Sequence, residues 1–193
     1  MADKRRLGTY EHPVARSLAG KPGTGIDAEC NECRQPNSQN GGKRGPRGYD
    51  GGKKIKGRKR HIAVDTEGFL LKVVVTAANV GEREGAKQLI EGFKEQFPRL
   101  KLLWVDGGYD GQPFADWVLD KLSCRVEITH PPAGSKGFVS VAFRWVVERT
   151  FAWLGKFRRL SKEYESLPES SESYIYAAMI HIMARRLAKQ APA

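Results

Sequence analysis

The sequence predicts an α/β protein in which helices pack on a mixed sheet. Two segments rich in β-branched residues, His61–Asp65 and Phe69–Thr76, flank a three-residue turn and read as a hairpin. An amphipathic helical pattern follows the hairpin. The next element is Leu102–Val105, a short continuous apolar run of the kind found in buried parallel strands. Strand and helix patterns continue to alternate, so antiparallel and parallel pairing are both expected in one sheet.

The remaining elements are predicted from periodicity and from Gly and Pro breaks. Residues 1–24 show no sustained period and are expected to be irregular, so the folded domain is predicted to span 25–193. Helices are predicted at 84–97, 113–121, 143–154 and 171–188, strands at 24–28 and 125–129, and a loop at 131–139.

Positive charge is concentrated in one part of the chain. The 193 residues carry a formal net charge of +11, and nine of the cations lie between Lys43 and His61 against one Asp. We expect residues 31–60 to form a basic, Gly-rich loop whose most economical partner is nucleic-acid phosphate. The cations predicted to contact DNA there are Lys53, Lys54, Lys56, Arg58 and Arg60. The same run is also compatible with a merely solvated loop.

The sequence argues against a membrane-spanning protein and against a disulfide-stabilised one. No apolar run approaches the ~20 residues of a membrane span, so no membrane partner is expected. Three cysteines, an odd number, argue against a disulfide framework and for a reducing compartment.

Three carboxylates lie on separate predicted elements. Asp106 ends the buried strand and is followed by two glycines, which allow the backbone to approach a ligand closely. Glu148 lies on a later helix and Asp27 on the first predicted strand. Carboxylate oxygens suit Mg²⁺, and a pair of such ions can stabilise the attacking and leaving oxygens of a phosphoryl transfer. Ordinary surface acids would show the same separation in sequence, so spacing alone does not distinguish a metal site from unrelated surface residues.

Three stretches resemble the catalytic domain of bacterial insertion-sequence DDE transposases, in particular the group typified by insertion sequence five. They are GYDGGKKIKGRKRHIAVDTEGFLLKVVVTAANV, WVDGGYDG and FRWVVERTFAWLGKFRRLSKEYE. The resemblance covers roughly Gly25 to the C-terminus. It implies a ribonuclease H-like fold, and an Asp, Asp, Glu triad that binds two Mg²⁺ ions for strand cleavage and strand transfer, with Mn²⁺ able to substitute.

The resemblance assigns the catalytic and metal-binding residues one by one. The second Asp corresponds to Asp106 in WVDGGY and the Glu to Glu148 in RWVVERT. The first Asp of the family lies in a motif resembling IDSQSVK, and Asp27 matches it although the residues after it differ. Asp65 is the alternative first ligand, but its place at a hairpin turn favours a turn-forming role.

The same resemblance implies DNA contacts and biological partners. Arg144, Arg149 and Lys156 are expected to contact phosphates, and Tyr109 to stack on or hydrogen-bond to DNA unless it is simply packed. The expected partners are the insertion-sequence ends, the target DNA and a second copy of the chain, in the cytoplasm of a bacterium. The family usually carries a helical DNA-binding region ahead of the first Asp, whereas residues 1–26 of this sequence show no helical periodicity. The resemblance therefore suggests a truncated or split-frame copy. The alternative functions are an inactive basic DNA-binding remnant and a nuclease-like domain that acts only through partners.

Overall fold

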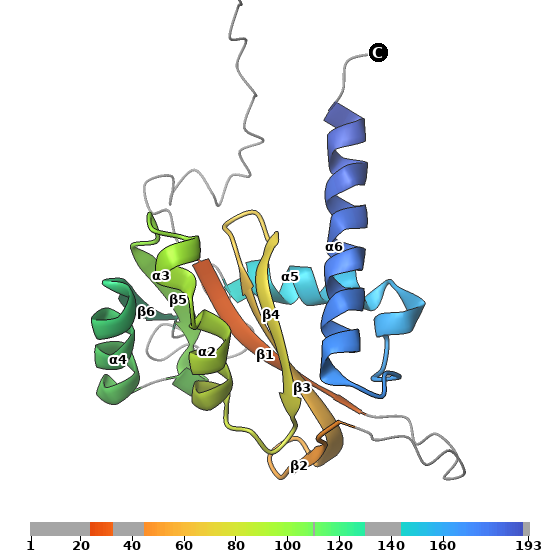
Figure 1. Ribbon diagram of the computed structural model, residues 1–193, viewed down its shortest axis with the longest axis horizontal. Coiled ribbons are helices and arrows are strands. Elements are labelled where there is room, and N and C mark those ends of the chain that lie inside the picture. The colour runs from red at the N-terminus through yellow and green to blue at the C-terminus, as the bar shows by residue number, and fades with distance from the viewer. Residues whose placement is uncertain (1–23, 33–44, 110, 130–143, 191–193) are drawn as a thin grey trace, which may run out of the picture.

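A six-stranded mixed sheet organises the fold. The computed structural model describes residues 24–32, 45–109, 111–129 and 144–190, with residues 24–32, 129 and 144 described by their backbone alone. The strands are β1 (Thr24–Glu32), β2 (Gly48–Asp50), β3 (Ile55–Val64), β4 (Leu70–Ala77), β5 (Leu102–Asp106) and β6 (Arg125–Thr129). β1 lies between β3 and β5, and β6 follows β5; β2 and β4 both pair with β3 (Figure 1).

The two halves of the sheet differ in strand direction. β3 runs antiparallel to β1, β2 and β4, whereas β5 runs parallel to both β1 and β6. The predicted combination of antiparallel and parallel pairing in one sheet is therefore confirmed. This topology is consistent with the ribonuclease H-like fold.

Helices cover both faces of the sheet. The helical elements are α2 (Glu82–Ile90), α3 (Phe93–Gln96), α4 (Gln112–Leu122), α5 (Arg144–Gly155) and α6 (Pro168–Gln190), with short 3-10 turns η1 (Gly107–Tyr109) and η2 (Arg158–Leu160). β3 shows how the faces separate, because side chains alternate along a strand. Ala63 packs in a core with α2, α3 and α4, whereas Ile62 and Val64 pack in a second core with α5 and α6.

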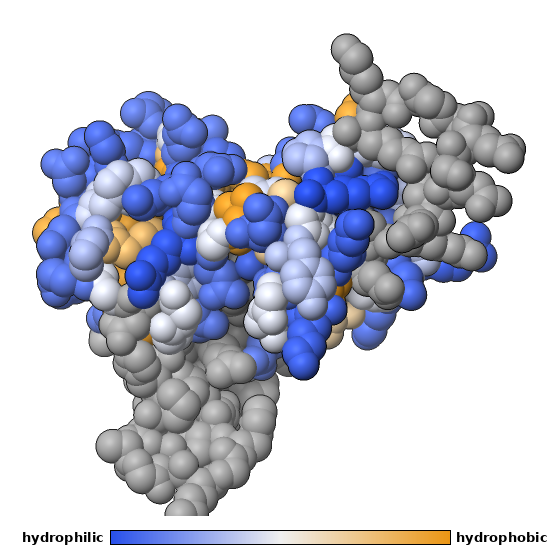
Figure 2. Space-filling model, turned by 90° about the horizontal axis from the view of Figure 1, so that it is seen from below, coloured by the Kyte–Doolittle hydropathy of each residue, from blue (hydrophilic) through white to orange (hydrophobic). Residues whose placement is uncertain are grey.

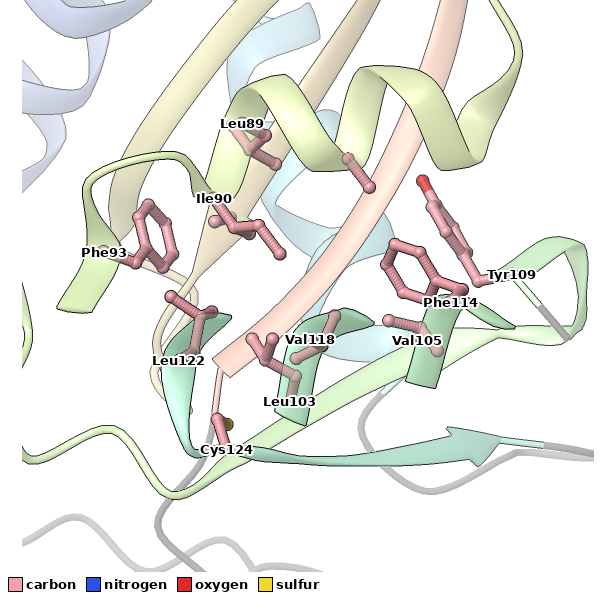
Figure 3. Packing of buried hydrophobic residues seen from close by; sticks show 12 residues of the cluster. Leu89, Ile90, Phe93, Leu103, Val105, Tyr109, Phe114, Val118, Leu122 and Cys124 are labelled. Carbon is pink, nitrogen blue, oxygen red and sulfur yellow. The ribbon is translucent and has the colours of Figure 1, made fainter. Parts of the chain in front are cut away.

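The core beneath α2 and α4 encloses Tyr109. Its side chain is fully buried, and its ring lies 5.7 Å from that of Phe114 (Figure 3). Val105, at the end of β5, packs in the same cluster. Tyr109 therefore belongs to the core, and the prediction that it contacts DNA is corrected: a side chain without exposed surface cannot stack on a base.

The basic stretch differs most from its prediction. Residues 33–44 lie outside the described part of the chain, but β2 and the first half of β3 occupy positions expected to be loop. Arg58 and Arg60 are buried in β3 and bonded within the protein, so their predicted contacts with DNA are wrong. Lys53, Lys54 and Lys56 remain exposed.

Other boundaries shift less. The helix predicted at 84–97 is interrupted because Gly92 adopts a left-handed conformation (φ 77°), which ends α2 and lets Phe93 begin α3. The first strand extends four residues past Ala28, and the last helix is longer at both ends than predicted. The irregular region predicted at 1–24 (apart from Thr24, which begins β1) and the loop predicted at 131–139 lie outside the described residues.

His61 is buried between β3 and α2. Its Nε2 lies 3.0 Å from Oγ1 of Thr76 on β4, and a Cβ placed on Gly85 of α2 would collide with the ring. Burial, aided by the positive charges of Lys59 and Lys53, lowers the pKa of His61 from 6.5 to about 4. The imidazole is thus neutral in the folded protein at neutral pH.

This lowered pKa predicts a loss of stability in acid. Below pH 6.5 the unfolded chain protonates His61, while the folded chain does so only near pH 4, so the free energy of unfolding falls as pH falls across this window. At 1.36 kcal/mol per pKa unit, the difference amounts to about 3 kcal/mol. Urea unfolding measures the free energy of unfolding of the wild type and of His61→Gln. The difference between the two proteins should be smaller at pH 4 than at pH 7.5 by this amount. His181→Gln is the matched control variant, because it removes an exposed histidine and leaves the buried one in place.

Candidate active site

Asp27 and Asp106 occupy equivalent positions on neighbouring parallel strands. β1 and β5 are paired at Ile26 and Val105, and each Asp is the next residue along its strand. Adjacent strands in a sheet lie ~4.8 Å apart. The register therefore brings the backbones of the two predicted ligands together at the carboxyl end of β5, where α/β proteins usually bind ligands.

Asp106 is held at this edge by the turn that follows it. Its side chain is half-buried, and its Oδ1 accepts a hydrogen bond of 2.8 Å from the backbone N–H of Gly108. Gly108 leaves room for the two carboxylates beside it. A Cβ on Gly108 would lie 3.0 Å from that same oxygen and would collide with Oε2 of Glu82, at the start of α2.

Glu82 is a carboxylate that the sequence analysis did not single out. It lies in the first turn of α2 and shares the space above Gly108 with Asp106. In the sequence it reads as an ordinary acid at a helix N-terminus. Only the close approach of α2 to η1 brings it to the site.

The third predicted ligand lies on the helix that covers these strands. α5 packs against β1, β3 and β5, and Glu148 is exposed on it. The helix is fixed by Val146, Val147 and Leu154, which pack in the core it shares with α6. All three predicted ligands thus lie on elements that touch one another. No three acidic, histidine or cysteine side chains converge as a metal site among those the structure describes, a set that leaves out the side chain of Asp27.

Asp65 lies elsewhere and forms part of the hairpin turn. On β3, Ile62 is paired with Asp27, and Asp65 lies three residues further on, ~10 Å along the strand direction. Its Oδ1 accepts hydrogen bonds from the backbone N–H groups of Glu67 and Phe69, at 2.9 and 2.8 Å. Burial raises its pKa. This is the geometry of a turn-forming Asp.

Arg149 also contributes to the hairpin turn. Its guanidinium carbon lies 4.4 and 4.7 Å from the ring centres of Trp145 and Trp153, and Nη2 donates a 2.6 Å hydrogen bond to the carbonyl of Glu67. Burial lowers the pKa of Arg149. The cation therefore joins α5 to the β3–β4 turn, and its predicted phosphate contact stays a prediction.

The other predicted phosphate ligands lie at the two ends of α5. Arg144 is its first residue, and its side chain lies outside the description. Lys156 follows the last turn and is exposed. The two positions lie on either side of Glu148 in the chain, and their phosphate contacts stay a prediction.

The fold defines a ribonuclease H-like domain whose acidic positions lie at the carboxyl end of β5 and on the covering helix. A family model described as the transposase DDE domain matches residues 19–183. The chain belongs to this family.

Two curated relatives agree with this membership. The transposase assigned to insertion sequence element IS402 of Burkholderia cepacia is 30% identical over 120 residues, which cover 56% of this chain and 54% of the relative. The transposase for insertion sequence element IS1106 of Neisseria meningitidis serogroup B is 27% identical over 148 residues, covering 71% and 50%. The chain thus spans about half the length of the curated relatives it matches.

Proposed function

We propose that this chain cleaves and rejoins DNA strands in the transposition of an insertion sequence, in a bacterial cytoplasm and as a homodimer. The observation that carries the proposal is the matched position of Asp27 and Asp106 on neighbouring parallel strands, beneath the helix that bears Glu148. Family membership and the two transposase relatives support it.

The donor set fits a divalent cation. Asp27, Asp106 and Glu148 offer carboxylate oxygens, the ligands that Mg²⁺ prefers and Mn²⁺ also accepts. Two such ions would supply an activated water and neutralise the charge that develops on the phosphate. The Gly108 N–H donates a hydrogen bond to Oδ1 of Asp106 and so restricts the orientation of that carboxylate. Glu82 adds a neighbouring negative charge to the space above Gly108.

The proposed reaction has two phosphoryl transfers. Water attacks a phosphodiester at the end of the element and leaves a 5′ phosphate and a free 3′ hydroxyl. That hydroxyl then attacks a phosphodiester of the target, forms the new ester bond and expels a 3′ hydroxyl of the target strand. Lys156 and Arg144 would hold the phosphates on either side of Glu148. The chain contributes positioning and charge and forms no covalent bond with DNA in this scheme.

The test is metal-dependent nicking by the purified protein. Supercoiled plasmid carrying the element ends should be nicked in Mg²⁺ or Mn²⁺ and remain intact in EDTA. A protein that binds the plasmid but never nicks it in either metal would contradict the proposal and favour the inactive DNA-binding alternative.

The exposed lysines in the β2–β3 turn and at the start of β3 are the part of the basic stretch that we expect to bind phosphate. The turn lies at the bottom of Figure 1, and hydrophilic side chains predominate on the face seen from below in Figure 2. Replacing Lys53, Lys54 and Lys56 with Ala should reduce the magnitude of the negative slope of log affinity against log salt by up to ~2.7. This follows from ~0.9 per phosphate contact on duplex DNA. Fluorescence anisotropy over a salt series measures the slope.

The matched control removes three lysines from another surface. Lys94, Lys101 and Lys121 are exposed on and beside α3 and α4. Their replacement with Ala causes the same loss of net charge but should leave the slope unchanged. Equal slopes for both triple variants would show that the turn binds no phosphate.

A further inference from the structure

The β2–β3 hairpin exposes an aromatic ring at the edge of the sheet. Tyr49 is the central residue of β2, which is the outermost strand beside β3 in the sheet that the structure describes (Figure 1). Its side chain is 56% exposed and belongs to neither hydrophobic core. The ring therefore offers a large surface to a partner, and the packing of the two cores does not account for it.

Lys56 lies beside this ring. The register of the hairpin pairs Tyr49 with Lys56, and both side chains are exposed. Residues directly opposite each other on antiparallel strands point to the same face, with Cβ atoms ~4.5–5.5 Å apart. The aromatic ring and the ammonium group are thus neighbours on one surface. Single-stranded nucleic acids bind to this combination, because a base stacks on the ring and the cation attracts the phosphate.

The one acid of the basic stretch is paired within the hairpin. Oδ2 of Asp50 lies 3.1 Å from Nζ of Lys59, and Oδ1 accepts two hydrogen bonds of 2.9 Å from backbone N–H groups of the turn. Because Asp50 is engaged in this way, its charge is offset locally. Lys54 and Lys56 are exposed and give the hairpin surface a positive potential, which is complementary to phosphate.

The hairpin is supported from its other face. Gly48 of β2 pairs with Gly57 of β3, and a Cβ on Gly48 would collide with the side chain of Asn79, which follows β4. The N–H of Ala78 donates a 3.1 Å hydrogen bond to the carbonyl of Gly57. Since successive side chains point to opposite faces of a strand, this support leaves the Tyr49 ring on the open side.

The open side of the hairpin is the side of the sheet that carries the third predicted ligand. Lys56 and Ile62 are six residues apart on β3 and so point to the same face, and Ile62 packs in the core shared with α5, the helix of Glu148. Ile62 is paired with Asp27, which places Lys56 ~20 Å from that position along the strand. At ~3.4 Å per nucleotide, a DNA strand would span this distance with ~6 nucleotides.

We propose that Tyr49 and Lys56 form a binding site for single-stranded DNA, in which the ring stacks on an unpaired base and the amine pairs with a neighbouring phosphate. The inference rests on the proposed function only in that it takes DNA as the partner. Every base has a face that can stack, so the site needs no particular sequence. Within a duplex the faces of the bases are covered by their neighbours, so the ring distinguishes single strands from duplex DNA.

The first test measures the affinity of the full chain for an oligothymidine by fluorescence anisotropy in EDTA. Tyr49→Ala should weaken binding by about 5- to 150-fold, the range found when a stacking aromatic is replaced by alanine. Tyr49→Phe keeps the ring and should bind like the wild type, whereas Tyr49→Leu is apolar without a ring and should not. Leu119→Ala is the control, because Leu119 is 53% exposed on α4, which packs on the other face of the sheet.

The second test separates the ring from the charge. Lys56→Ala should reduce the magnitude of the slope of log affinity against log salt by ~0.7 on the single strand, whereas Tyr49→Ala should leave the slope unchanged. On duplex DNA, Tyr49→Ala should bind like the wild type. Ultraviolet irradiation of an oligothymidine that contains 5-iodouracil, which crosslinks to aromatic rings stacked on it, should place a crosslink on Tyr49 when the peptides are mapped by mass spectrometry.

The outcomes separate this inference from the proposed function. A folded Tyr49→Ala variant that binds the single strand like the wild type overturns the stacking site, as does a wild type that does not bind single strands. Equal weakening by Tyr49→Phe and Tyr49→Ala would assign the effect to the hydroxyl and would also overturn it. All of these measurements are made without a divalent metal. Failure of metal-dependent nicking with normal single-strand binding would therefore contradict the proposed activity alone.

Discussion

Replacing Glu163 with Gln is expected to lower the free energy of unfolding by about 3–5 kcal/mol, the cost of removing one partner from a buried ion pair. The Glu163 side chain has no exposed surface and lies 3.5 Å from Nη1 of Arg58 and 3.6 Å from Nη2 of Arg60. Oε1 also accepts hydrogen bonds from Ser171 and from the Glu165 N–H. Glutamine retains the shape and much of this bonding but removes the charge that compensates two buried guanidinium groups.

These two arginines cannot leave their positions to find water. Arg58 donates to the carbonyl oxygens of Pro46, Glu165 and Ser166 at 3.0, 3.1 and 2.6 Å. Arg60 donates to those of Leu160 and Lys162 at 2.8 and 3.2 Å. β3 is thereby joined to the segment between η2 and α6, about 100 residues away in sequence. Loss of the Glu163 charge therefore weakens the junction of the sheet with the C-terminal helix.

Urea unfolding at pH 7 measures the effect, and Glu165→Gln is the control. Glu165, whose side chain is 13% exposed, pairs with Arg159 at 2.7 Å, and the Arg159 side chain is 57% exposed, so solvent screens the pair. Surface pairs of this kind contribute ~0–1 kcal/mol. Equal destabilisation by the two substitutions would mean that the buried charge of Glu163 is not what holds β3 to the C-terminal segment.

The buried arginines also explain where the sequence analysis failed. Hydrophobic periodicity is the main signal for a strand, and the first half of β3 has almost none because its inward residues are cations. Their partners are one carboxylate and five carbonyl groups distant in sequence, which no local pattern contains. By contrast, β5 and β6 were predicted within one residue because their apolar runs and flanking breaks are local.

The candidate site was predictable to a similar, partial extent. Asp106 was identifiable because a buried strand ends there before two glycines, and family resemblance supplied Asp27 and Glu148. The register of β1 against β5 relates Asp27 to Asp106, and pairing between strands some 80 residues apart cannot be read from either segment. Tyr109 was misassigned because η1 turns its ring into the core. In the sequence, a Tyr that follows a strand looks the same whether its ring is buried or exposed.

Asp106→Asn is expected to reduce metal-dependent nicking by ~10³-fold or more, equivalent to ~4 kcal/mol of transition-state stabilisation. An asparagine oxygen can still accept the Gly108 N–H, so the turn and the fold should persist. What the variant loses is the negative charge offered to the cation. Plasmid nicking in Mg²⁺ measures the activity, and thermal unfolding monitors the fold. Asp120→Asn, at a side chain that is 79% exposed on α4, should leave both unchanged.

The same assay decides between the two candidates for the first ligand. Asp27→Asn should abolish nicking as Asp106→Asn does, because the two residues follow paired positions on parallel strands. Asp65→Asn should retain nicking: both hydrogen bonds that its side chain accepts end on Oδ1, which asparagine keeps. Mn²⁺ binding measured by calorimetry gives a readout independent of turnover, and it should weaken in Asp27→Asn but not in Asp65→Asn. Loss of both metal binding and nicking in Asp65→Asn, with Asp27→Asn unaffected, would transfer the ligand role to the hairpin turn.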